Sequence, residues 1–88
     1  MRIDDVIRVY EIDQNDLKSN WSENLYRFEL IDINTRAFVY EEDEKVLGFI
    51  IAKYIGDTSD LLQIAVDIAH KQMKIGKKLL NYCIEQLK

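Results

Sequence analysis

Four lysines gather around one glycine near the C-terminal end of the sequence, within the segment His70–Leu80. They are Lys71, Lys74, Lys77 and Lys78, and the glycine is Gly76. Where such a segment begins a helix, the first backbone N–H groups lack intrahelical partners and, together with the helix dipole, favour a bound anion. A glycine also lets a phosphate approach the backbone closely. The segment therefore has the residue types needed to hold the phosphates of a nucleotide-type cofactor.

Spacing alone leaves two interpretations of this segment open. It contains neither the G-x-x-x-x-G-K-S/T pattern of P-loops nor the G-x-G-x-x-G pattern of dinucleotide-binding folds. It has a single glycine, and Lys74 stands where a second glycine would help. Both a solvated basic helix start and a phosphate cradle fit these residues.

The other residues that could do chemistry have simpler structural interpretations. His70 is the sole histidine and a candidate base, but its place before a helix favours an exposed loop residue. Cys83 is the sole cysteine, which excludes an internal disulfide, and it falls in an apolar helical stripe that favours core packing. Trp21 could contact an acceptor peptide or anchor a helix against a sheet. The sequence shows no cluster of metal-ligand residues, so we expect no metal site.

Composition is that of a small globular protein. The chain has 88 residues, of which 48% are hydrophobic and 32% are charged, and these values argue against disorder. The length limits it to a single small domain. No window approaches the roughly 18 apolar residues of a membrane helix, and the N-terminus lacks a signal-peptide core. We therefore expect a cytoplasmic protein with no membrane partner.

Charge is distributed unevenly along the chain. Residues 1–69 contain 7 lysines and arginines against 15 aspartates and glutamates, whereas residues 70–88 contain five lysines against Glu85 alone. The net charge of −4 thus conceals an acidic body and a basic C-terminal quarter. This pattern favours a local anion site and argues against nucleic acid as a partner, because a nucleic-acid groove needs a wider basic surface.

The elements that must position the lysine-rich segment follow from apolar periodicity. Helical spacing and an N-cap at Ser22 predict two helices before the lysine-rich segment and one that begins within it. Alternating or apolar runs separated by polar turns predict three strands between them. The predicted helices are Asp4–Leu17, Ser22–Ile31 and Ile75–Leu87. The predicted strands are Ala37–Tyr40, Val46–Ile55 and Leu61–Val66, with turns at Glu41–Lys45 and Gly56–Ser59.

The predicted fold class is α/β (α+β layered), in the order ααβββα with a mostly antiparallel sheet. The strand Leu61–Val66 is almost entirely apolar, so we expect it to be buried on both faces. It lacks a partner on one side. An open edge of this kind invites pairing with another chain, which predicts a homodimer or a completing chain.

Three segments together resemble the GNAT superfamily of acetyl-CoA-dependent N-acetyltransferases. They are Val46–Ile51, Gln63–Asp67 and Lys71–Leu80. With Asn20-Trp21-Ser22 opening the second helix, the chain is similar, more narrowly, to the bacterial acetyltransferases that modify the N-terminal alanine of a ribosomal protein. The resemblance covers nearly all of residues 1–88 as a single, partial GNAT-like domain, about the first three-fifths of a typical family domain.

The family's cofactor motif, R/Q-x-x-G-x-G/A, falls on Lys71–Gly76. Gly76 matches, Lys71 is a cationic substitute for Arg or Gln, and Lys74 replaces the middle glycine. The resemblance implies that backbone N–H groups of this segment hold the coenzyme A pyrophosphate. It also implies that the end of the third strand pairs with the pantetheine arm, with the Val66 N–H near the thioester carbonyl. The implied cofactor-binding residues are Ile64, Ala65, Val66, Lys71, Gln72, Met73, Lys74, Ile75, Gly76 and Lys77.

The resemblance also implies elements for which residues 1–88 have no counterpart. The glutamate proposed as general base in the family, and the tyrosine that protonates the departing thiolate, would lie beyond Lys88, so no catalytic residue is assigned. We expect an acetyl-CoA-dependent N-acetyltransferase acting on a protein N-terminus or other primary amine, with the acceptor near Trp21, and incomplete as a lone chain. The alternative is a non-catalytic binding or oligomerisation remnant of the domain.

Overall fold

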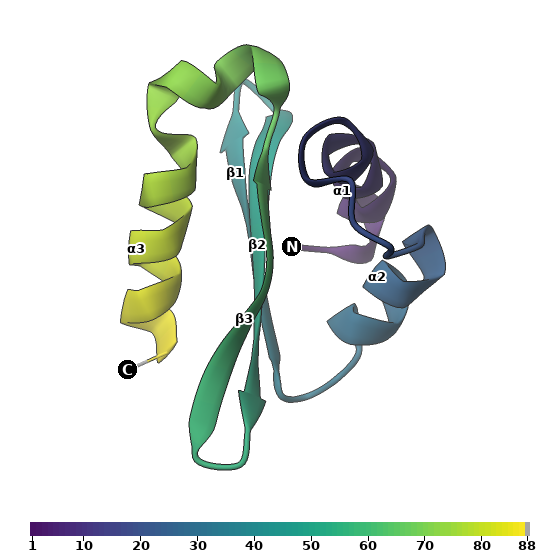
Figure 1. The fold of residues 1–88 in the computed structure, drawn as a ribbon, viewed down its shortest axis with the longest axis vertical. Coiled ribbons are helices and arrows are strands. Elements are labelled where there is room, and N and C mark those ends of the chain that lie inside the picture. The colour runs from purple at the N-terminus through teal and green to yellow at the C-terminus, as the bar shows by residue number, and fades with distance from the viewer. Residues whose placement is uncertain (88) are drawn as a thin grey trace.

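The computed structural model describes residues 1–87, apart from the side chain of Gln72. In this part of the chain a three-stranded antiparallel sheet lies between two helices on one face and one helix on the other (Figure 1). The predicted α/β class and the order ααβββα are confirmed. The helices are α1 (Val6–Ile12), α2 (Glu23–Leu30) and α3 (Ile75–Leu87), and the strands are β1 (Thr35–Glu42), β2 (Lys45–Ile55) and β3 (Thr58–Val66). Short helical turns are η1 (Ile3–Asp5), η2 (Asp13–Leu17) and η3 (Ile68–Met73).

The two N-terminal helices begin and end close to where the sequence predicts. The segments η1, α1 and η2 follow one another without a break and together match the predicted helix Asp4–Leu17. The last of them, η2, is a wide π-helical turn that ends at Lys18 in the left-handed conformation, with φ 54°. Ser22 caps α2 as predicted, because its Oγ accepts a hydrogen bond of 3.1 Å from the Leu25 N–H.

The hairpin between β1 and β2 is tighter than predicted. The expected five-residue turn Glu41–Lys45 is wrong, because the strands continue until Glu42 pairs with Lys45. Asp43 and Glu44 alone form the turn, with φ of 52° and 64°. A two-residue turn of positive φ matches the right-handed twist of the flanking strands. The backbone pairing therefore continues to Glu42 and Lys45, whose charged side chains had indicated a turn.

The strand β2 lies at the centre of the sheet, in the order β1-β2-β3, and is buried on both faces from Val46 to Ala52. The predicted two-sided burial of β3 is wrong for its first half, where Leu61 is 50% exposed. The reason is visible in Figure 1, where the β2–β3 hairpin extends past the ends of α2 and α3. The helices cover the second half of β3, so burial begins at Gln63.

Two cores pack against opposite faces of β2. On one face Phe49 and Ile51 meet α1 and α2, and on the other Leu47, Ile50 and Ala52 meet α3. Cys83 is 2% exposed in the second core, so its predicted structural role is confirmed. The helix residues of the two cores are Val6, Val9, Ile12 and Tyr26 on one side and Ile75, Leu79 and Cys83 on the other.

The apolar stripe of α3 is wider than the face that the sheet covers. Leu80, Tyr82 and Ile84, predicted as part of the stripe, are 39%, 53% and 46% exposed. A helix packed on one side only buries the row that faces its partner, here Ile75, Leu79 and Cys83. The stripe of α3 therefore leaves apolar side chains at the surface.

Close packing of α3 on β2 depends on Gly48. A Cβ at this position would lie 3.0 Å from Ile75 Cγ2 and 3.1 Å from Leu79 Cδ1. We expect Gly48→Ala to lower the free energy of unfolding by about 1–3 kcal/mol, because α3 must shift to admit the methyl group. Urea denaturation measures this.

The matched control is Gly76→Ala within α3. A Cβ there would meet only Val66 Cγ2, at the ordinary distance of 3.7 Å. Because alanine favours the helix over glycine, this variant should equal or exceed the wild type in stability. Equal losses in the two variants would contradict the packing role of Gly48.

Candidate functional site

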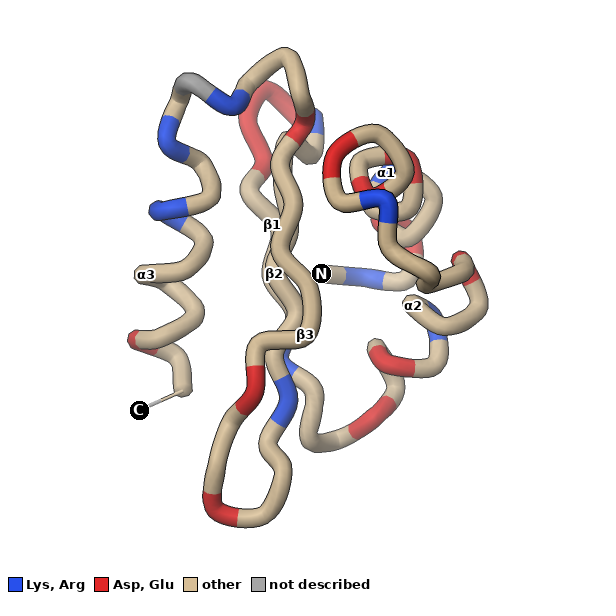
Figure 2. The backbone as a smooth tube through the Cα atoms, viewed as in Figure 1, with Lys and Arg blue, Asp and Glu red and all other residues tan. Residues whose placement is uncertain are grey.

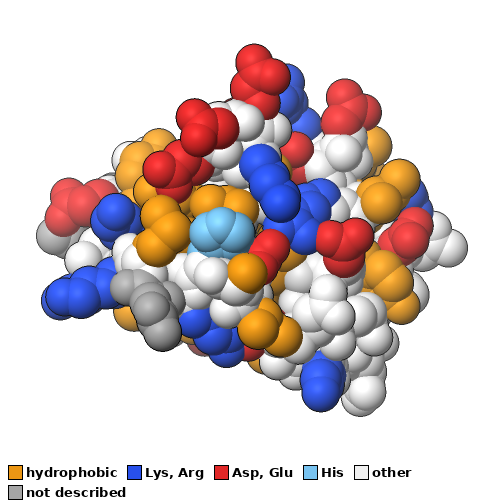
Figure 3. All heavy atoms as spheres, turned by 90° about the horizontal axis from the view of Figure 1, so that it is seen from above, with side chains coloured by type: hydrophobic (Ala, Val, Ile, Leu, Met, Phe, Trp, Pro, Cys, Tyr) orange, Lys and Arg blue, Asp and Glu red, His pale blue; other side chains and the backbone are white. Residues whose placement is uncertain are grey.

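The lysine-rich segment lies where β3 turns into α3. The strand ends at Val66, η3 follows, and α3 begins at Ile75. Figure 2 shows the lysines of η3 and the start of α3 at the same end of the molecule as the acidic β1–β2 turn. Viewed onto that end, basic and acidic side chains alternate over the surface (Figure 3). The predicted segment is therefore exposed and local, without an extended basic surface on this face.

The start of α3 has the geometry of an anion site. The Lys78 N–H donates to the Lys74 carbonyl at 3.2 Å and begins the helical ladder, so the N–H groups of Ile75, Gly76 and Lys77 precede it. The Ile75 side chain is fully buried and fixes this turn against β2. Packing within the chain does not require Gly76, because a Cβ there would fit. Its glycine instead keeps the backbone open to an approaching group.

Lys74 occupies the left-handed region, with φ 58° and ψ 31°. The family motif has glycine at this position, and the structure supplies a backbone reason for it, since glycine alone adopts this conformation freely. A lysine there costs about 1 kcal/mol or more. The sequence showed only that Lys74 replaces a glycine of the motif and did not predict this strain.

The second half of the candidate site is the open edge of β3. Gly48 pairs with Val66, and the Asp67 N–H donates to the Leu47 carbonyl at 2.8 Å. Because antiparallel residues alternate in direction, the Val66 N–H points away from β2, and Ile64 has the same orientation. The side chains of Ala65 and Val66 are buried, so it is the backbone that this edge offers. The fold thus brings the edge of β3 and the start of α3 together, as predicted.

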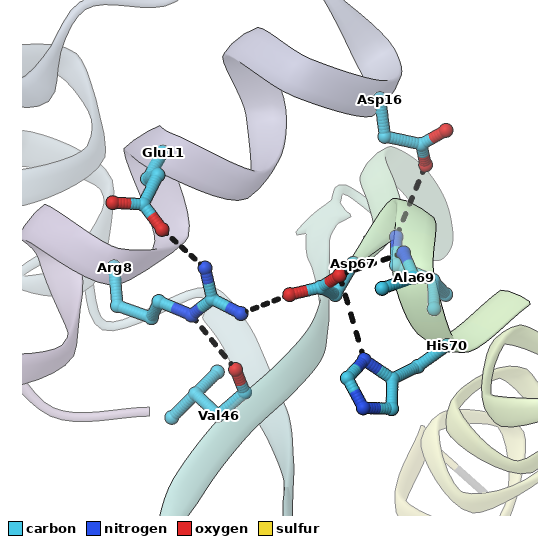
Figure 4. A network of polar contacts seen from close by, with 8 residues as sticks. Arg8, Glu11, Asp16, Val46, Asp67, Ala69 and His70 are labelled. Atoms are coloured by element: carbon cyan, nitrogen blue, oxygen red, sulfur yellow. Dashed lines mark hydrogen bonds and ion pairs between the residues drawn. The ribbon is translucent and has the colours of Figure 1, made fainter.

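The Val66 N–H already has a partner within the chain. It donates to Asp16 Oδ2 at 3.1 Å, and the other carboxylate oxygen of Asp16 pairs with Lys71 Nζ. Figure 4 shows Asp16 reaching from η2 toward the end of β3. Sequence reasoning missed Asp16, because it lies 50 positions before Val66 and belongs to no motif.

Asp67 joins η3 to α1. Its carboxylate pairs with the Arg8 guanidinium and accepts the Ala69 N–H at 2.8 Å, which caps η3 (Figure 4). Arg8 also donates through Nε to the Val46 carbonyl at 2.9 Å. Hydrogen bonding from Arg8 lowers the pKa of Asp67 to about 2. This network fixes the path of the chain as it leaves β3.

His70 lies on η3 and is half-buried, so the predicted exposed loop position is wrong. Its Nδ1 is 3.5 Å from Asp67 Oδ1, because η3 turns the ring back toward its capping residue (Figure 4). Nδ1 is buried, and no hydrogen-bond partner for it is found among the described residues. The ring therefore lies beside the residue that caps η3.

Trp21 anchors α2, which confirms the structural interpretation of this residue. It is half-buried against the core, and its ring centroid lies 4.9 Å from that of Tyr26. Beneath it the fully buried Asp13 accepts hydrogen bonds from Ser19 and the Tyr26 hydroxyl, and Gln63 of β3 joins this cluster. Burial, more than any other cause, raises the pKa of Tyr26 above its usual value. A contact of Trp21 with an acceptor peptide stays a prediction.

An apolar hollow lies elsewhere, between β1 and α3. It is lined by residues that include Phe38, Tyr40 and Tyr82, and the N-terminal ammonium lies near it, bonded to the Ala37 carbonyl at 3.0 Å. Since β1 and β3 are opposite edges of the sheet, this hollow lies away from the edge of β3, although Lys78 of the lysine-rich segment lines it. Among residues 1–87, the described side chains form no group of three or more acidic, histidine or cysteine residues suited to a metal ion. No helix in this part is long and apolar enough to cross a membrane.

Comparison with known proteins gives the class of protein that this fold and site define. A sequence profile of the Acetyltransferase (GNAT) family matches residues 6–88, and the chain therefore belongs to that family. It is 27% identical over 90 residues to a Bacillus subtilis (strain 168) protein provisionally named a ribosomal-protein-bS18 alanine N-acetyltransferase. The match takes in 100% of this chain and 59% of that protein.

A solved structure gives the same result. The crystal structure of the ribosomal-protein-S18-alanine N-acetyltransferase from Escherichia coli superposes with a TM-score of 0.88 at 25% identity, and the match takes in 99% of this chain and 56% of that one. The chain thus spans somewhat more than half the length of both relatives. Both comparisons confirm the resemblance drawn from the sequence.

The Arg8–Asp67 pair predicts a pH dependence of stability. Because the folded-state pKa of Asp67 lies below that of an unfolded aspartate, its stabilising contribution is present above about pH 4 and is lost as the pH falls toward 2. We expect Asp67→Asn to remove about 2 kcal/mol of stability at pH 7, with the difference from wild type closing between pH 4 and 2. Urea denaturation across this range measures it.

A second variant tests whether Arg8 causes the lowered pKa of Asp67. Arg8→Met keeps Asp67 but removes the main cause of its lowered pKa, so it should flatten the same acid limb of the stability curve. A difference from wild type that stays constant from pH 7 to 2 would show that the pair does not form in solution.

Proposed function

We propose that this chain carries the acetyl-CoA-binding part of a GNAT N-acetyltransferase, with residues 1–88 as a single partial domain. The observation that carries the proposal is the position of the outward-facing Val66 N–H beside the open first turn of α3. In this arrangement the pantetheine arm would pair with Ile64 and Val66 along the edge of β3. The pyrophosphate would meet the N–H groups that follow Lys74, with Lys71 and Lys77 supplying positive charge.

The chemistry that this arrangement supports is transfer of an acetyl group to an amine. When bound, acetyl-CoA supplies the acetyl group as a thioester. An N–H directed at the thioester carbonyl, here that of Val66, stabilises the negative charge that develops on oxygen as the amine nitrogen attacks. The two relatives carry names that specify the alanine of ribosomal protein S18. We therefore propose a protein N-terminus, or a similar primary amine in the cytoplasm, as acceptor.

No residue of the described chain is assigned as general base or acid. The chain covers a little over half of its relatives, and the family resemblance implies that both groups lie in the part of the fold that these residues do not include. We expect residues 1–88 to bind acetyl-CoA but to catalyse transfer poorly unless that part is supplied. Binding, not turnover, is accordingly the property to test.

Calorimetric titration of the 88-residue chain with acetyl-CoA tests the proposal. We expect saturable binding, and we expect acetyl-pantetheine, which lacks the pyrophosphate, to bind more weakly. Gly76→Ala should weaken acetyl-CoA binding about tenfold, since a methyl group at the start of α3 disturbs hydrogen bonds to a charged phosphate. The absence of heat at millimolar acetyl-CoA would reject the proposal.

Lys74→Gly should change acetyl-CoA affinity in the opposite direction to Gly76→Ala. It removes the Cβ that would lie beside the pyrophosphate, so it should tighten acetyl-CoA binding even though one positive charge is lost. Lys74→Ala is the control, because it removes the charge but keeps the Cβ and the strain. Equal affinities for wild type and Lys74→Gly would show that the motif is assigned to the wrong residues.

A second candidate function is self-association through the open edge of β3. It is favoured by the position of β3 at the edge of the sheet, with Leu61 half exposed. We expect sedimentation to give a mass above that of the 10.4 kDa chain at high concentration. Leu61→Lys should reduce it, whereas Ile55→Lys, which charges an equally exposed position of β2, should not. A mass near 10.4 kDa throughout would reject a homodimer.

A further inference from the structure

Asp16 contacts two groups that acetyl-CoA would need, the Val66 N–H and the Lys71 ammonium. One carboxylate oxygen accepts the Val66 N–H at 3.1 Å, and the other pairs with the ammonium of Lys71. We propose that Asp16 is an internal latch, which holds the acetyl-CoA site closed and must release both groups before the ligand binds. This inference rests on the proposed function, since it takes the edge of β3 as the place of the thioester.

The geometry of the two contacts makes the carboxylate a substitute for the ligand. An outward N–H at a strand edge donates one strong hydrogen bond, so Asp16 and a thioester carbonyl cannot both accept it from Val66. Lys71 is at the first position of the cofactor motif, and its pairing with Asp16 neutralises the charge available to a phosphate. One side chain therefore occupies the acyl end of the site and lowers the positive charge available at its phosphate end.

A carboxylate in this place would also oppose the reaction. Attack on a thioester places negative charge on the carbonyl oxygen, and the fixed charge of Asp16 beside the same N–H would repel it. The charge thus makes the contact unfavourable for catalysis as well as for binding, and the side chain must turn away.

The Asp16 side chain can leave the Val66 N–H without unfolding of η2. Asp13, one turn before Asp16, is fully buried and held by Ser19 and Tyr26, so it fixes the backbone of η2. The Asp16 side chain is 16% exposed and Lys71 is 53% exposed, so the ion pair lies beside solvent. Rotation of the Asp16 side chain would free the Val66 N–H while the Asp13 cluster stays in place.

Two substitutions of Asp16 separate the effect of its charge from the effect of its hydrogen bond to Val66. Asp16→Asn keeps an oxygen that can accept from Val66 but loses the charge, and Asp16→Ala loses both. We expect Asp16→Ala to bind acetyl-CoA about tenfold more tightly than wild type, or more, with Asp16→Asn between them. Asp57→Ala and Asp57→Asn, in the exposed β2–β3 turn, remove the same charge from the acidic body and should leave the affinity unchanged.

The amide resonance of Val66 gives a readout that does not need the ligand. In the free wild type we expect it to report a hydrogen bond to the carboxylate, by a downfield shift and slow exchange, and to lose both in Asp16→Ala. Urea denaturation of each variant shows whether it remains folded. Loss of the downfield shift in Asp16→Ala, with the shift kept in Asp57→Ala, supports the latch, and a Val66 resonance that is unchanged in Asp16→Ala overturns it.

The outcomes distinguish this inference from the proposed function. If wild type binds acetyl-CoA and Asp16→Ala binds it no more tightly than Asp57→Ala, the latch is wrong and the proposed function stands. If none of the wild type, Asp16→Ala and Lys74→Gly binds at millimolar ligand, the proposed function is wrong, and the latch falls with it.

Discussion

Burial of β2 on both faces is the constraint on which the rest of the structure depends. Its apolar residues from Val46 to Ala52 must be covered twice, by α1 and α2 on one side and by α3 on the other. After β3 the chain must therefore cross to the free face, and η3 makes that crossing (Figure 1). The absence of a side chain at Gly48 allows α3 to pack closely against β2. The start of α3 is thus brought beside the end of β3 as a consequence of covering the core.

Polar groups hold this crossing in place where apolar packing ends. Asp67 is the last residue before η3, and it binds Arg8 of α1 and the Ala69 N–H at once. Asp13 of η2 holds the neighbouring part of β3, within a cluster that includes Tyr26 and Gln63. Charge-assisted hydrogen bonds of this kind are strong because their partners are partly withdrawn from water. They orient the backbone that a cofactor would contact.

The candidate site shows two departures from what binding requires. Lys74 adopts a left-handed conformation that glycine would adopt without strain, and Asp16 holds the Val66 N–H that an acyl group would need. On the proposed function, the chain keeps the framework of an acetyl-CoA site while the Asp16 side chain occupies part of it.

The sequence by itself determined the order of elements, the family and the segment of the candidate site. Apolar periodicity predicted α3 from Ile75 to Leu87, and the spacing from Lys71 to Gly76 identified the motif, because both signals lie within a few neighbouring residues. It could not predict the partial exposure of β3 or the position of His70, since burial depends on which helices reach each part of the sheet. Only the tertiary structure decided that Asp16 meets Val66. Contacts between residues 50 positions apart leave no local pattern, because they arise when a folded core brings distant segments together.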